Sequence, residues 1–179
     1  MKTFRHMERT PATDQLGVAL IISLIILVIM TLLGMSAIRL ITSEERMATN
    51  SYDRNLAFQA TEATLKEVES LIETEVPTPA AGSGCAKVGS VMVCGLAAAG
   101  STSRWLDDTF TSWESATTVG SGTLAITPKY FVEYLGNTFA CRPGDSSDPI
   151  NCKRYRVTAQ TQGSDGRASV TLQSIYATE

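Results

Sequence analysis

The positions of apolar and polar residues divide the chain into three stretches. Residues 1–15 are mostly polar, residues 16–38 carry no charged side chain, and the remainder mixes both kinds. A hydrocarbon core of about 30 Å needs about 20 helical residues, and the uncharged stretch has 23. A secretory h-region is shorter, about 7–15 residues, and a buried core helix shows regularly spaced polar positions. We therefore predict a membrane-spanning helix over about 18–38.

The helical pattern continues beyond the uncharged stretch. After Gly34, no glycine or proline occurs until Pro77, and strong helix formers dominate the segment between them. We predict a single helix over 18–76, in which the part over 39–76 is an amphipathic extension outside the membrane.

One face of this extension is apolar. Leu65, Val68 and Ile72 recur at spacings of three and four, as on one side of a helix. Glu62 precedes Lys66 by four residues, which is the favourable order for an ion pair on a helix. We expect most of the other charges of the extension to form a solvated face.

Residues 77–179 are predicted to form a small α+β head built on an antiparallel sheet. The clearest strands are 154–162 and 168–177, whose side chains alternate and which flank a GSDG turn at 163–166. Further strands are expected at 129–136 and, more weakly, at 91–96.

Two other segments of the head lack strand patterns. Residues 77–84, PTPAAGSG, end the helix and form a linker or turn. Residues 97–125 are rich in Ser, Thr, Gly and Ala, and we expect a loop with at most a short helix. Its large side chains, Trp105, Phe110 and Trp113, are expected to hold it to the sheet.

All four cysteines lie beyond the predicted span. Cys85 and Cys94 form one local pair in the sequence, and Cys141 and Cys152 form another. Four cysteines allow three connectivities, of which we expect the one that pairs sequence neighbours. A zinc site is disfavoured because there is no CxxC and the single histidine, His6, precedes the span. Disulfides persist in oxidising compartments, so we expect the head in the periplasm or outside the cell.

The charges on the two sides of the span are nearly balanced in Lys and Arg, so the positive-inside rule does not decide the orientation. The formal net charge is -3 and no basic patch stands out. Nucleic acid is therefore not expected as a partner.

Catalytic motifs are absent from the sequence: there is no GxSxG, no P-loop and no HExxH. Asp107 with Asp108, and Asp145 with Asp148, are the nearest approach to carboxylate clusters. Such pairs can act in general acid–base catalysis, and Asp145 with Asp148 is also a candidate calcium ligand pair. The GDSSDP spacing, however, is typical of turns. We expect turns, no enzymatic activity, no cofactor and no metal site.

The order of these stretches resembles the type IV pilin-like proteins, in which a polar leader ending in glycine precedes a long apolar helix and a disulfide-bonded head. The segment GVALIISLIILVIMTLLGMSAIRL and the string EERMATNSYDRNLAFQATEATL resemble the N-terminal domain of PilX-type minor pilins over about residues 16–66. TPKYFVEYLG and YRVTAQTQGSDGRASVTLQSIY resemble that family's C-terminal strands. The resemblance implies a leader over 1–17, cleaved between Gly17 and Val18 by a prepilin peptidase.

The resemblance also makes the absence of a carboxylate at position 22 informative. Most pilins carry glutamate at the fifth mature position, where this chain has Ile22. That glutamate is thought to neutralise the N-terminal amine of a neighbouring subunit. PilX-type proteins and the tip pseudopilin of type II secretion share its absence, and both are assigned to the tip of their filament. The usual mature N-terminal phenylalanine is replaced here by Val18.

The resemblance implies a minor pilin in the initiating tip complex of a type IV pilus. Before assembly the protein would be anchored in the inner membrane, with its N-terminus in the cytoplasm and its head in the periplasm. After assembly it would lie at the pilus tip. The partners it implies are other minor pilins, the major pilin, the prepilin peptidase and a PilY-type adhesin. The alternative function is that of a tip pseudopilin of type II secretion, and a third hypothesis is a membrane-anchored periplasmic enzyme. The candidate assembly residues on the helix are Ile22, Glu44, Glu45, Arg46, Asn50, Arg54 and Glu62.

Overall fold

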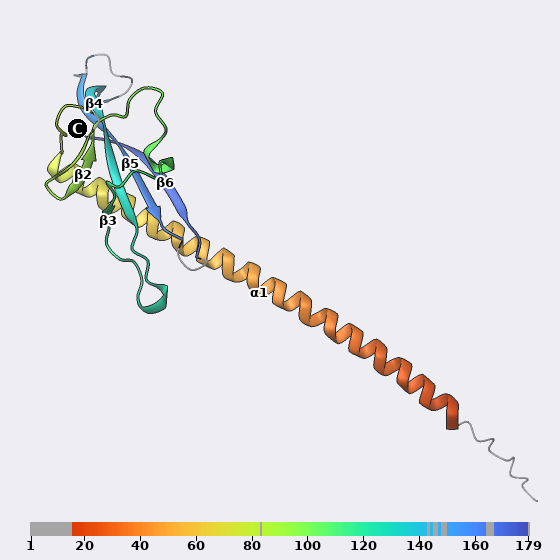
Figure 1. Cartoon of the computed structure of the whole chain (residues 1–179). Coiled ribbons are helices and arrows are strands. Elements are labelled where there is room, and N and C mark those ends of the chain that lie inside the picture. The colour runs from red at the N-terminus through yellow and green to blue at the C-terminus, as the bar shows by residue number, and fades with distance from the viewer. Residues whose placement is uncertain are drawn as a thin grey trace, which may run out of the picture. The chain divides into compact units, whose positions relative to one another are not determined.

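The computed structural model describes residues 16–82, 84–142, 144, 147, 150–163 and 167–178. The chain divides into two compact units, Met1–Met47 and Ala48–Glu179. The elements in chain order (Figure 1) are α1 (Leu16–Glu75), β1 (Cys85–Val88), β2 (Val91–Cys94), the 3-10 helix η1 (Arg104–Leu106), β3 (Glu114–Ser115), the 3-10 helix η2 (Gly122–Leu124), β4 (Lys129–Ala140), β5 (Ile150–Thr161) and β6 (Val170–Ala177).

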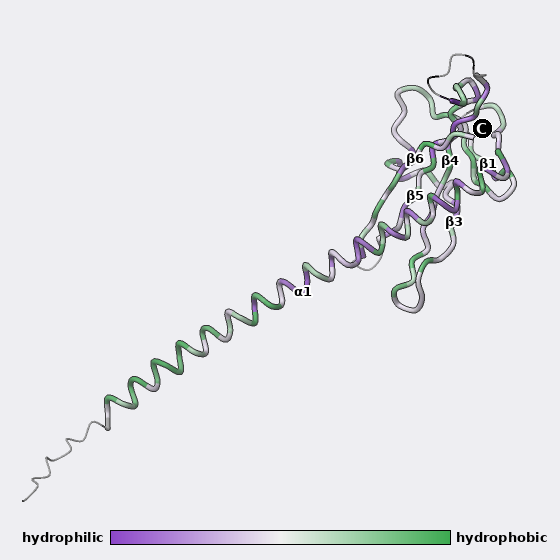
Figure 2. The backbone as a smooth tube through the Cα atoms, turned by 180° about the vertical axis from the view of Figure 1, so that it is seen from behind, coloured by the Kyte–Doolittle hydropathy of each residue, from purple (hydrophilic) through white to green (hydrophobic). Residues whose placement is uncertain are grey.

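Helix α1 is continuous, as predicted, and its first part lies in the first unit. By length and composition this helix qualifies as a membrane span. Its hydroxyl side chains donate hydrogen bonds to carbonyls of the preceding turn: Ser23 to Leu20 at 2.9 Å and Thr31 to Val28 at 2.8 Å. Because the helix itself satisfies these polar groups, they add little cost in an apolar surrounding. Figure 2, which colours the backbone by residue hydropathy, shows hydrophobic residues along the length of this part.

The part of α1 in the second unit packs against the sheet. Leu65, Val68 and Ile72 are buried and belong to the core, which confirms the predicted apolar face. One and two turns earlier, the buried positions of the helix are Ala57, Ala60, Thr61 and Thr64. Small side chains allow the helix backbone to approach the sheet, and larger ones fill the space toward the helix end.

The sheet has six strands in the order β1-β2-β4-β5-β6, with β3 paired to β4. Tyr155, Val157 and Ala159 of β5 are buried on the face toward α1, as their alternation predicted. The expectation of a purely antiparallel sheet is wrong in one place, because β2 runs parallel to β4. A parallel pair requires a long crossover connection, and residues 95–128 supply one. The remaining pairs are antiparallel.

Two strands were not predicted. β1 pairs with β2 through a tight turn in which Gly89 has a φ of 62°, a conformation that glycine adopts without strain. β3 has only two residues. The turn between β5 and β6 is longer than the predicted GSDG, because the last pair of this ladder joins Thr161 to Val170. Residues 164–166 lie outside the described residues.

The segment between β2 and β4 covers the face of the sheet opposite α1. Phe110 and Trp113 pack edge-on against Phe131 of β4, with ring centroids 4.8 Å apart in each case. Beside them Arg104 forms an ion pair with Glu133, whose side chain is 6% exposed, and donates to the Gly95 carbonyl at 2.9 Å. The expected anchoring is therefore confirmed for Phe110 and Trp113, whereas Trp105 takes no part in these ring contacts and is 38% exposed. The ion pair adds an anchor that the sequence did not reveal.

Candidate assembly surface

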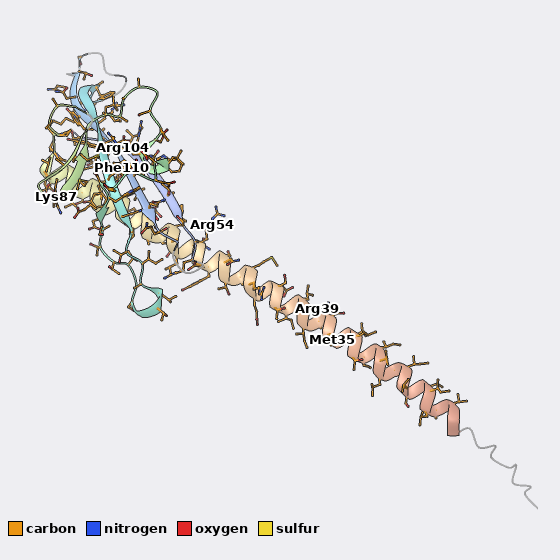
Figure 3. The ribbon with its side chains drawn as sticks, in the orientation of Figure 1. Met35, Arg39, Arg54, Lys87, Arg104 and Phe110 are labelled. Carbon is orange, nitrogen blue, oxygen red and sulfur yellow. A yellow bond between two sulfur atoms is a disulfide. The ribbon has the colours of Figure 1, made fainter. Side chains whose placement is uncertain are left out.

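The part of α1 that lies in the first unit has exposed apolar side chains on all sides. Val18 is 58% exposed and Ile22 is 52% exposed, and the two lie one helical turn apart. A side chain added at Gly17 would meet no atom within 4 Å. Figure 3 shows side chains around Met35 projecting outward in the same way. A surface of this kind needs lipid or other apolar helices around it.

The predicted polar candidates on α1 are all exposed. They are Glu44, Glu45, Arg46, Asn50, Arg54 and Glu62. Glu62 pairs with Lys66 at 3.7 Å, as expected from their spacing. An exposed pair of this kind contributes only about 0.3–0.5 kcal/mol, so it adds little to the fold. All six side chains are accessible to other molecules.

Arg54 borders a groove that the sequence did not predict. The groove has a volume of about 370 Å³ and lies between α1 and β6. Asn55 and Phe58 line its helical wall, and residues 169–172 line the other. Phe58 remains 46% exposed, so this wall offers an aromatic ring beside a guanidinium. Figure 3 shows Arg54 projecting from the helix beside the sheet.

Several carboxylates that were expected to be solvated instead bind the head to the helix. Asp53 accepts a hydrogen bond from the Ala168 backbone N–H at 2.6 Å and one from Arg167 Nε at 3.1 Å. The Ala168 N–H, followed by the Arg167 guanidinium, lowers the pKa of Asp53. Its partners are more than 100 residues away in the chain, so no local spacing could have identified them.

Glu67 and Glu69 act in the same way on two other segments. Glu67 accepts hydrogen bonds from the Thr117 hydroxyl at 2.8 Å and from its N–H at 3.3 Å, which attaches the chain after β3 to the helix. Glu69 accepts one from the Ser174 hydroxyl of β6 at 2.7 Å. The two glutamates therefore tie segments from different parts of the sheet to α1.

Glu75 closes the end of the helix against the β1–β2 turn. Its carboxylate accepts hydrogen bonds from the hydroxyl and the backbone N–H of Ser90, the latter at 3.0 Å. The Ser90 hydroxyl is the main cause of the lowered pKa of Glu75. A Cβ at Gly89 would meet this carboxylate, which is the flexible end of an exposed side chain and can move aside, so the φ of 62° is the reason for glycine at this position.

The disulfides join the expected partners. Cys85 and Cys94 face each other in the β1–β2 ladder, and Cys141 is bonded to Cys152 of β5. The first bond fixes a hairpin at the edge of the sheet, and the second closes the chain between β4 and β5. Each closes a short loop in a head that has a small core.

The structure describes one of the two candidate carboxylate clusters, Asp107 with Asp108, and it shows Asp107 in a turn. Asp107 accepts hydrogen bonds from the Thr109 N–H at 2.9 Å and from its hydroxyl at 2.6 Å, which is a turn arrangement. These bonds lower the pKa of Asp107. Asp145 and Asp148 lie outside the described residues, and among those described no group of three potential metal ligands is found.

Comparison with known families accounts for both units. Residues 17–66 match the family described as PilX N-terminal, and residues 49–178 match the family described as type IV pilus assembly protein PilX C-term. Comparison with curated proteins and with solved structures gives no match. PilX is a structural pilin family that is not known for enzymatic activity. The matches together cover the apolar helix and the whole described head, so the chain belongs to the PilX family and is a minor pilin of a type IV pilus.

Proposed function

We propose that this minor pilin occupies the tip of the pilus, as part of the complex that primes assembly and displays a PilY-type adhesin. The observation that carries the proposal is Ile22, an apolar residue at the fifth position after the predicted cleavage site. No acidic side chain occurs in residues 16–38. The helix therefore offers no carboxylate to a neighbour within its apolar part.

The carboxylate at the fifth position matters because it pairs with the N-terminal amine of a neighbouring subunit. An amine buried among apolar helices costs several kcal/mol unless an opposite charge pairs with it. A subunit with glutamate at the fifth position supplies that charge to a neighbour, whereas Ile22 does not. A subunit that cannot receive another amine fits a terminal position, where no further neighbour needs the pairing.

The proposed topology places residues 1–17 in the cytoplasm as a leader, residues 18–76 as the long helix and residues 77–179 as the periplasmic head. The two disulfides support an oxidising location for the head. The inner membrane would surround the apolar part of the helix until assembly. There the exposed apolar side chains would pass from lipid contacts to contacts with other minor pilins and the major pilin.

Processing by a prepilin peptidase between Gly17 and Val18 is part of the proposal. N-terminal sequencing of the membrane-extracted protein should give a chain that begins at Val18. Gly17→Val should retain the leader, because a β-branched side chain crowds the backbone at the cleavage site. Gly34→Val, at the other glycine of this part of the helix, should still be processed. A wild-type chain that keeps Met1, or a processed Gly17→Val variant, would contradict this step.

Deletion of the gene tests the priming role. The number of pili per cell should fall strongly, while the remaining pili keep normal length and diameter, because initiation and elongation are separate steps. Complementation with the wild-type chain should restore the number. An unchanged number of pili, or shorter pili at normal number, would contradict the proposal.

A tip pseudopilin of type II secretion is less consistent with the head. Such proteins usually have a larger head with a helical insertion, and the described head contains only two 3-10 helices of three residues each. No observation favours that alternative over a pilus subunit.

A further inference from the structure

The face of the sheet opposite α1 carries an open cleft. It has a volume of about 580 Å³ and lies between the η1 segment and the ends of β4 and β5. The cleft is lined by aromatic and polar side chains, among them Trp105, Trp113, Asp108, Lys129, Gln160 and Gln162. A concave site that combines aromatic rings with a few convergent polar groups is the usual form of a small-molecule site.

The aromatic floor of this cleft consists of Phe110 and Trp113, which pack against Phe131 of β4. Phe110, Trp113 and Phe131 pack edge to face, with ring centroids between 4.8 and 5.9 Å apart. Phe131 is 1% exposed and fixes the group to the sheet. Lys129 lies 4.5 Å from the centroid of the Trp113 ring, and burial lowers the pKa of its amine. Arg104, which Figure 3 labels together with Phe110, secures the same segment through its ion pair with Glu133.

Trp105 differs from the rings of the floor. It takes no part in the edge-to-face group of Phe110, Trp113 and Phe131, and it is 38% exposed. The chain around it is nevertheless held in place, because Arg104 is paired with Glu133 and Asp107 accepts two hydrogen bonds from Thr109. An exposed indole on a fixed backbone offers a ring face to a ligand at a low entropic cost.

The chemistry of the lining selects one class of ligand. The negative face of an aromatic ring attracts the C–H groups on one side of a pyranose ring. The carboxylate of Asp108 accepts hydrogen bonds from hydroxyls, and the amides of Gln160 and Gln162 both donate and accept. We propose that this cleft binds a neutral hexopyranose unit of a glycan, stacked on Trp105 and hydrogen-bonded by Asp108 and the two glutamines.

The charges in the cleft disfavour other ligands that stack on aromatic rings. Asp107 and Asp108 outnumber Lys129, so the site is net negative at neutral pH. Nucleic acid requires Lys and Arg to neutralise its phosphates, and sialic or uronic acids carry a carboxylate that the aspartates repel. An apolar peptide side chain would leave the polar groups of the lining without partners. A neutral sugar avoids all three penalties.

The site goes beyond the role in assembly, because a head that binds sugar does so whether or not it occupies the pilus tip. The two proposals are therefore tested separately. The binding experiment uses the full chain in phospholipid nanodiscs, which contain no sugar detergent that would occupy the cleft. The probes are methyl glucoside, methyl galactoside, N-acetylglucosamine and their disaccharides. Saturation-transfer NMR and titration calorimetry measure their binding.

We expect at least one of these neutral sugars to bind and Trp105→Ala to weaken that binding about tenfold or more, as truncation of a stacking ring does. Asp108→Asn should weaken it less. Leu106→Ala is the matched control, because Leu106 belongs to the same 3-10 helix, is 57% exposed and does not line the cleft. That variant should bind as the wild type does. Near-UV circular dichroism should show that all three variants keep the packed head.

Three results would overturn the proposal. The first is that no neutral sugar of the panel binds to the wild type. The second is that binding occurs but is unchanged in a folded Trp105→Ala variant, which places the sugar elsewhere. The third is that sialic acid or an oligothymidylate of similar size binds more tightly than every neutral sugar, which would assign the cleft to a different class of ligand.

Discussion

The two parts of helix α1 share one backbone conformation and differ in what their side chains contact. From Val18 to Met47 every residue is exposed in its unit. In the part that follows Ala48, a stripe from Ala57 to Ile72 is buried against the sheet and four carboxylates bind segments of the head. The exposed apolar side chains of the first part need contacts that a membrane or other subunits supply. The second part instead packs against the sheet of the same chain.

The difference shows that helix formation and helix packing have separate causes. Both parts lack proline, and both consist mainly of residues with good helix propensity or of apolar residues that suit a membrane. What decides the packing is whether apolar positions occupy one side or all sides. Variants that alter matched positions in the two parts should therefore have very different effects on the head.

The largest effect is expected from a cavity in the packed part. Ile72 is fully buried, so Ile72→Ala should lower the free energy of unfolding of the head by about 2–5 kcal/mol. Ile41→Ala makes the same change at a position that is 54% exposed in the first unit, and it should alter the head by less than about 0.5 kcal/mol. Urea denaturation of the full chain in nanodiscs, followed by near-UV circular dichroism, measures both. Equal effects of the two variants would contradict the division.

Loss of a disulfide should have the next largest effect, and it should be confined to the second unit. Cys85→Ala with Cys94→Ala should destabilise the head by about 2.5–3 kcal/mol, and so should the pair Cys141→Ala with Cys152→Ala. The far-UV signal of the membrane-embedded helix should persist when the head unfolds. Peptide mapping without reductant checks the pairing, and a crossed Cys85–Cys152 bond would refute it.

A smaller effect is expected at the carboxylates that join helix and head. Asp53→Asn removes the charge that accepts hydrogen bonds from Ala168 and Arg167, and it should cost about 1 kcal/mol because the site is partly exposed. Glu62→Gln is the control, because the exposed Glu62–Lys66 pair contributes about 0.5 kcal/mol at most. Urea midpoints should separate the two variants, and a midpoint for Asp53→Asn no lower than that of Glu62→Gln would show that the contact adds nothing.

The same carboxylates should make the head sensitive to acid. The folded pKa values of Asp53 and Glu75 lie below their ordinary values of 3.8 and 4.5, so the folded head binds fewer protons than the unfolded chain in this range. Their stabilisation is therefore complete above about pH 5 and is lost as the pH falls through the lowered values. Unfolding curves between pH 2 and 7 should show this loss, with a weaker dependence in Asp53→Asn. A pH profile identical to wild type would contradict the role of Asp53.

The sequence predicts those features that depend on local pattern. The continuous helix, the buried face with Leu65, Val68 and Ile72, and the strands around Tyr130 and Val157 follow from periodicity, and short spacing predicts the disulfide partners. These features need no knowledge of distant contacts.

Features that depend on distant contacts could not be predicted in this way. The parallel pairing of β2 with β4 depends on the path of a long connection with no strand pattern of its own. Asp53 and Glu67 look like ordinary solvated helix charges until the fold places Ala168 and Thr117 beside them. The cleft near Trp105 combines side chains from three segments, and only their folded arrangement brings them together.

The position of the subunit in the filament is the central claim, and immunogold labelling of intact pili tests it most directly. Antibodies against the head should label wild-type pili at one end only, because a subunit with Ile22 fits the tip, where no neighbour above it needs a carboxylate. The major pilin, labelled in parallel, should decorate the whole shaft. Label for this chain spread evenly along the shaft would mean that it is incorporated throughout, and that the absence of glutamate at position 22 does not mark a terminal subunit.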